Sequence, residues 1–145
     1  MTLYADASLL VKLFIAEAGS DQVQALVAPP FITGTALISR AEVAAGLAKA
    51  AKIGRVTPEE AGQALAKFRG QWPRLLRLPV YESLVAWADE LAWELNLRGY
   101  DAVHLAAALT WQRTLGKPLT MGTYDRQLWQ AAQSKGLTVW PETLG

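Results

Sequence analysis

Residues 98–111, RGYDAVHLAAALTW, join an acidic side chain to the start of a long apolar run. Between residues 102 and 115, apolar side chains occupy almost every face of the predicted helix, which is typical of a helix buried on all sides. Asp101 directly precedes this run. It is either a cap that satisfies free backbone N–H groups or a carboxylate held at a chemical site, and its neighbours in the sequence fit both interpretations.

Short strand-like segments alternate with helical patterns on both sides of this stretch. We predict strands at residues 2–5, 31–33, 78–81, 119–121 and 138–140. We predict helices at residues 8–16, 20–27 (with Ser20 as its cap), 41–52, 102–115 and 126–135, and two more that begin near Thr57 and after Tyr81. Thr57, Pro58 and Glu60 have the spacing of a capping box. The alternation predicts a mainly parallel sheet covered by helices on both faces, with the carboxyl ends of its strands at one edge.

The composition limits the classes of protein to which the chain can belong. With 145 residues, of which 52% are hydrophobic and 19% charged, we expect one globular domain over residues 1–145. The absence of cysteine excludes disulfides, thiolate zinc sites and cysteine nucleophiles. No uncharged apolar run reaches about 18 residues and no signal-peptide pattern is present, so we expect a cytoplasmic protein without a membrane span.

Basic residues are concentrated in the segment 49–77, although the net charge is only +1. The segment contains Lys49, Lys52, Arg55, Lys67, Arg69, Arg74 and Arg77. Its only acids are Glu59 and Glu60. These cations either lie on solvated helix faces or form a positive patch for a polyanion.

Four carboxylates lie near the starts of predicted helices, and three of them also follow a predicted strand. They are Asp6, Glu42, Asp101 and Asp125. Each alone is explained as a helix cap or as a favourable neighbour of the helix dipole, and residues 39–42 also fit a capping box. The topology, however, brings all four to one sheet edge, where their charges would repel. A divalent cation removes that conflict, and an oxygen-only ligand set suits Mg²⁺ or Mn²⁺ in phosphate chemistry.

The single histidine and the tryptophans allow further expectations. His104 alone cannot supply a pair of imidazoles that act as acid and base, and we expect it to be buried with a satisfied hydrogen bond. The tryptophans predicted to be in the core are Trp72, Trp87 and Trp111. Trp93 and Trp129 are less clearly inward, and for these we favour a protein interface over base stacking. Arg40 lies beside Glu42 and either faces the same edge or is a surface arginine.

Four segments together resemble the motifs of PIN-domain proteins, and in particular the VapC-type toxins of type II toxin–antitoxin pairs. The segments are YADASLLVKLFIAEAGSD (4–21), SRAEVAAGL (39–47), RGYDAVHLAAAL (98–109) and GTYDRQLWQAAQSKGLTVWP (122–141). Any one of these motifs is weakly specific, whereas four in this order and spacing, over residues 3–141, are specific.

The resemblance implies a metal-dependent endoribonuclease on a three-layer α/β/α fold. The family's acidic quartet corresponds to Asp6, Glu42, Asp101 and Asp125. In the family a small hydroxyl residue before the last acid supports the site, which here is Thr123, and we expect Ser8 to hold Asp6 or a bound water. The resemblance further implies an RNA substrate, an antitoxin partner and a homodimer, while one and two bound ions both remain open.

Three alternatives remain open at the level of the sequence. A PIN-domain nuclease that processes RNA without an antitoxin would use the same four acids. A non-catalytic binding module with this fold would usually lack one or two of them. A phosphate-accepting regulatory domain would need a lysine after a late strand, whereas Lys117 lies before the strand at 119–121.

Overall fold

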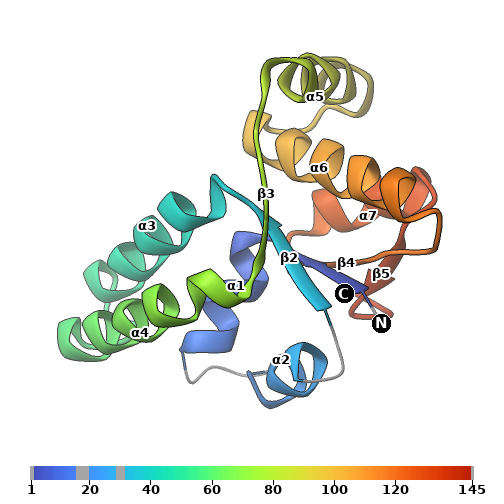
Figure 1. The fold of residues 1–145 in the computed structure, drawn as a ribbon. Coiled ribbons are helices and arrows are strands. Elements are labelled where there is room, and N and C mark those ends of the chain that lie inside the picture. The colour runs from blue at the N-terminus through green and yellow to red at the C-terminus, as the bar shows by residue number, and fades with distance from the viewer. Residues whose placement is uncertain (1, 16–19, 29–31, 145) are drawn as a thin grey trace.

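The computed structural model describes residues 2–15, 20–28 and 32–144 and contains one five-stranded parallel sheet (Figure 1). The strands are β1 Thr2–Ala5, β2 Ile32–Ala36, β3 Leu76–Leu78, β4 Thr120–Gly122 and β5 Thr138–Trp140. Their order across the sheet is β3-β2-β1-β4-β5, and every neighbouring pair is parallel. The predicted parallel sheet is therefore confirmed, and the strands' carboxyl ends share one edge.

Helices cover both faces of the sheet, as predicted. They are α1 Ala7–Phe14, α2 Ser20–Val27, α3 Ser39–Lys52, α4 Pro58–Gln71, α5 Glu82–Leu95, α6 Gly99–Leu115 and α7 Arg126–Ser134, with a 3₁₀ turn at Trp72–Arg74. Figure 1 shows α1 to α4 on one side of the sheet and α5 to α7 on the other. Each side has its own apolar core, so the three-layer α/β/α architecture is confirmed.

The helix that begins at residue 99 is the central element of one layer. Nine of its seventeen residues are buried, including a run of alanines that lets neighbouring elements approach closely. Gly34 in β2 contributes to this packing, because a Cβ there would lie 2.7 Å from the ring of Trp111. The sequence pattern ended the second strand at residue 33, whereas the structure continues it through Gly34 to Ala36. The glycine is therefore a packing position for α6 within the strand.

Two other predicted boundaries differ from the structure for identifiable reasons. The third strand was predicted at 78–81, but β3 ends at Leu78, because Pro79 has no N–H to continue the ladder. Ser20 is the first residue of α2 and not the residue before it, and its hydroxyl lies 2.8 and 2.6 Å from the carbonyl oxygens of Lys12 and Ile15. Ser20 therefore ties the start of α2 to α1.

The capping box at the start of α4 is confirmed, whereas the one considered for α3 is absent. Thr57 Oγ1 accepts from the Glu60 N–H at 3.1 Å, and Glu60 Oε1 accepts from the Thr57 N–H at 2.9 Å. At α3 the cap residue is Ile38, with no side-chain cap bond. The Ser39 hydroxyl instead pairs with that of Thr35 at 2.6 Å. Glu42 is thereby left for another role.

The tryptophans follow the sequence analysis only in part, because Trp87, which was predicted in the core, is half-buried against it and Trp129 is half-buried as well. Trp72 and Trp111 are buried, and Trp87 is half-buried, with the Arg113 guanidinium 4.3 Å from its ring. Trp93 is 91% exposed, and the indole N–H of Trp129 donates to the Pro141 carbonyl at 2.7 Å.

Among the described residues, no helix combines the length and hydropathy needed to cross a bilayer.

Candidate active site

A cavity of about 280 Å³ opens at the carboxyl edge of the sheet. Its lining residues are Asp6, Ala7, Ser8, Glu42, Arg98, Tyr100, Asp101, His104 and Asp125. All four carboxylates predicted from the sequence therefore lie in one hollow. Asp6 and Asp125 are the caps of α1 and α7, while Glu42 and Asp101 lie in the first turns of α3 and α6.

Asp6 is the most buried and most completely bonded of the four carboxylates. One of its oxygens accepts from Ser8 Oγ at 2.7 Å and from the Leu9 N–H at 3.0 Å. The other accepts from Thr123 Oγ1 at 2.5 Å. Burial raises the pKa of the Asp6 carboxyl, while the Thr123 and Ser8 hydrogen bonds act in the opposite direction. The two hydroxyls predicted to support the site are thus both in contact with Asp6, and they fix its orientation with neutral donors.

Asp101 and Asp125 face each other across a cation that the sequence analysis did not include. Arg98 Nε donates to Asp101 Oδ2 at 2.9 Å, and its terminal nitrogen pairs with Asp125 Oδ2. Burial raises the pKa of Asp101, and the charge of Asp125 raises it further, in opposition to Arg98. Asp101 itself makes no capping bond, since Arg98 is the cap residue of α6. The guanidinium therefore relieves the repulsion between two carboxylates that the quartet places together.

Glu42 is held by a buried chain of hydrogen bonds. His104 Nε2 lies 2.6 Å from Glu42 Oε1, and His104 Nδ1 lies 2.6 Å from the Tyr4 hydroxyl. The Tyr4 oxygen accepts from the Ala36 N–H at 3.3 Å, and burial raises the pKa of its hydroxyl well above the usual value. A neutral imidazole with its proton on Nε2 satisfies every member of this chain. His104 is buried with satisfied hydrogen bonds, as expected, and it orients Glu42.

The donor set fits a hard divalent cation, but the side chains are arranged for other partners. Over the described parts of the chain, no group of three or more His, Cys, Asp or Glu side chains is placed as a metal ion would require. Arg98 occupies two of the carboxylates, and His104 turns Glu42 toward itself. All four carboxylates offer oxygen donors, and such sets suit Mg²⁺ or Mn²⁺. Burial raises the pKa of Asp101, and the nearby charges of Asp125 and Asp6 raise it further. Binding of an ion would therefore require Arg98 to leave the acids.

Three residues of the cavity and its support were missed from the sequence, and one candidate lies elsewhere. Arg98 stands three positions before Asp101, a spacing at which helix side chains meet, so a signal was present. Tyr100 lines the cavity mouth, and Tyr4 reaches the site only through the fold. Arg40 does not line the cavity, and its guanidinium lies 5.9 Å from the centroid of the Trp72 ring.

A parallel α/β sandwich whose carboxyl edge gathers four carboxylates in one cavity defines a class of acidic-site α/β proteins. Within that class the chain belongs to the PIN domain family, whose model matches residues 3–133. The resemblance drawn from the sequence motifs is thereby confirmed.

Similar proteins of known name or structure agree with this assignment. Ribonuclease VapC45 from Mycobacterium tuberculosis is 34% identical over 143 residues, which are 98% of this chain and 96% of that relative. A chain of a toxin-antitoxin complex from Klebsiella pneumoniae matches with a TM-score of 0.69 at 20% identity, over 100% of both chains. Mycobacterium tuberculosis VapC20, a sarcin-ricin loop cleaving toxin, matches with a TM-score of 0.64 at 18% identity, over 99% of both chains. The two structural likenesses bear on the fold alone.

Proposed function

We propose that this protein is an endoribonuclease that depends on Mg²⁺ or Mn²⁺ and hydrolyses RNA phosphodiester bonds. The observation that carries the proposal is that four carboxylates line one cavity in a chain of the PIN domain family. We assign both metal binding and catalysis to Asp6, Glu42, Asp101 and Asp125. The identity to a relative named as a ribonuclease, over nearly the whole chain, supports the same reaction.

The cavity residues have distinct tasks in this reaction. A bound divalent ion would neutralise the carboxylates, orient the phosphate and stabilise the charge that develops on it. Asp6 is oriented for binding in advance, because Ser8 and Thr123 hold its two oxygens. Arg98 releases Asp101 and can then bind a phosphate oxygen, since its guanidinium matches phosphate geometry. Water attacks the phosphorus in line and the P–O3′ bond breaks. The leaving O3′ takes up a proton released by the water, so the products carry a 5′-phosphate and a 3′-hydroxyl.

We further propose that the protein is the toxin of a type II toxin–antitoxin pair. Its identity to a VapC ribonuclease supports this role, as does the fold it shares with a chain of a toxin-antitoxin complex. The expected partners are RNA as substrate, an antitoxin protein and a second copy in a homodimer. We expect a cytoplasmic location, because cellular RNA is found there.

The proposed activity is tested by incubating total RNA with the purified protein in Mg²⁺ or Mn²⁺, in EDTA, and with an Asp101→Asn variant in parallel. Discrete fragments should form with metal and should be lost in EDTA and in the variant. Asp89→Asn is the matched control, because Asp89 is an exposed acid of α5 away from the cavity. Fragments that persist in Asp101→Asn would contradict the assigned site. RNA left intact by the wild type would favour a non-catalytic binding module.

A further inference from the structure

A second hollow, a groove of about 470 Å³, opens directly beside the acidic cavity. Ala7, Ser8 and Glu42 line both hollows, so the groove and the cavity are contiguous. Residues of α1 and α3 line the groove, which extends toward the carboxyl end of α3. Its basic lining residues are Lys12, Lys49 and Arg55.

Several small residues stand in the lining of the groove, between larger basic, apolar and aromatic side chains. Ala7, Gly46 and Ala50 contribute little side chain to the lining. A Cβ on Gly46 would lie 3.1 Å from Val11 Cγ2, so the glycine lets α1 and α3 pack closely. Tyr124 also lines the groove, with Lys12 Nζ 4.7 Å from its ring centroid. The result is a channel with cationic and aromatic walls.

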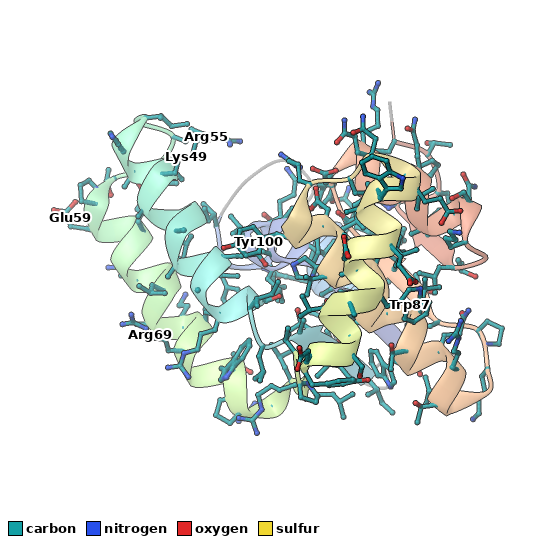
Figure 2. The ribbon with its side chains drawn as sticks, turned by 90° about the horizontal axis from the view of Figure 1, so that it is seen from above. Lys49, Arg55, Glu59, Arg69, Trp87 and Tyr100 are labelled. Carbon is teal, nitrogen blue, oxygen red and sulfur yellow. The ribbon has the colours of Figure 1, made fainter. Side chains whose placement is uncertain are left out.

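The basic segment 49–77 does not form one patch in the structure. Lys49 and Arg55 line the groove, whereas Lys67 lines a separate hollow beside α1 and α2. Arg69 lines a third hollow with Arg40. Figure 2 shows Lys49 and Arg55 near one end of the hairpin formed by α3 and α4, with Arg69 toward the other end. Only part of the positive charge therefore adjoins the acids.

We propose that the groove binds the sugar–phosphate backbone of single-stranded RNA next to the phosphate that enters the acidic cavity. The inference rests on the proposed function and deepens it by naming a substrate subsite. An RNA strand carries a phosphate at every nucleotide, so one strand can present one phosphate to the metal-loaded cavity and the next ones to Lys49 and Arg55. Glu42 is the acid that lines the groove, and its charge disfavours the carboxylates of an acidic peptide there. An RNA strand differs in that the phosphate nearest Glu42 would meet the cation bound in the adjoining cavity.

The test compares RNA binding by two double variants that remove the same charge. Lys49→Ala/Arg55→Ala alters the groove, and Lys67→Ala/Arg69→Ala alters the same hairpin away from both hollows. Both are made in an Asp101→Asn parent to prevent cleavage, with thermal unfolding measured for each. The probe is a fluorescein-labelled oligouridylate, and anisotropy gives its Kd over a series of salt concentrations. The groove variant should bind on the order of tenfold more weakly, with a slope of log K against log salt reduced by about 1.4.

Each result has a definite meaning for the groove. Equal losses of RNA affinity in the two double variants, or no loss in either, would overturn the proposal that the groove binds RNA. Binding would then depend on net charge or on another surface. Polyglutamate is the second probe, and groove-dependent binding of polyglutamate as tight as that of RNA would also overturn it in favour of an acidic protein segment. Cleavage by the wild type is measured separately. Cleavage with groove-independent binding would refute only the groove, whereas groove-dependent binding without cleavage would refute only the proposed function.

Discussion

The two ends of the acidic cavity hold their carboxylates in different ways. At one end Asp6 is fixed by neutral donors, the hydroxyls of Ser8 and Thr123 and the backbone of Leu9. At the other end Asp101 and Asp125 share a guanidinium, that of Arg98, whose side chain is 69% exposed. Neutral donors orient a carboxylate and leave its charge available to a cation, whereas a guanidinium neutralises the charge itself.

Under the proposed function, this difference predicts that the two ends contribute differently to metal binding. The Asp6 end is preorganised, and its geometry need not change when an ion binds. At the other end, Asp101 and Asp125 would have to exchange the Arg98 guanidinium for the metal ion. Loss of the contacts with Arg98 would reduce the free energy gained from metal binding. The following predictions separate the two contributions, and the largest effects are expected at the preorganised end.

Asp6→Asn should abolish most of the activity. The amide keeps a side-chain oxygen for the α1 cap but removes a negative charge from the metal site, which should cost on the order of a thousandfold in cleavage rate. Rates are measured under single-turnover conditions with saturating Mg²⁺, alongside thermal unfolding. A folded variant that retains the wild-type rate would remove Asp6 from the proposed catalytic set.

Thr123→Val tests the neutral donors themselves. The hydroxyl donates to Asp6 and accepts from the Asp125 N–H at 3.0 Å, so valine of similar shape leaves both groups without this partner. We expect a 10- to 100-fold loss of metal affinity or rate, as is typical when a partner of a metal ligand is removed. Thr123→Ser, which retains the hydroxyl, should stay near the wild type. Equal losses in the two variants would assign the effect to packing.

Arg98→Gln should act in the opposite direction on metal affinity. Removing the competing guanidinium leaves Asp101 and Asp125 available, and Mn²⁺ should bind about tenfold more tightly, by about 1.4 kcal/mol. Titration calorimetry without RNA measures this independently of catalysis. Arg126→Gln is the matched control, since Arg126 follows Asp125 but does not line the cavity. Unchanged or weaker Mn²⁺ binding in Arg98→Gln would mean that the guanidinium does not compete with the ion.

The sequence was sufficient to predict the parts of this site whose positions follow from the order of strands and helices. The four carboxylates were predictable because each lies near the start of a helix at the carboxyl edge of the sheet. The second contact of Arg98 was not predictable, since it joins two elements through Asp125, 27 residues away. The chain from Tyr4 to Glu42 likewise depends on a 100-residue separation between Tyr4 and His104. At Ser39 a local pattern failed because the Thr35 hydroxyl offered a better partner than the helix start.

The smallest expected effect is on the pH dependence of the free energy of unfolding, measured in EDTA, and it arises from Asp101 beside Asp125. Burial and then the charge of Asp125 raise the pKa of Asp101 above the ordinary 3.8, so the folded protein binds this proton more tightly than the unfolded chain. That contribution to stability is present in acid and is lost as the pH rises through the raised pKa. The free energy of unfolding of Asp101→Asn should therefore fall less between about pH 4 and neutrality. The fall should not vanish, because burial also raises the pKa of Asp6. Asp89→Asn should follow the wild type. Identical profiles for all three proteins would contradict a raised pKa of Asp101 in the folded state.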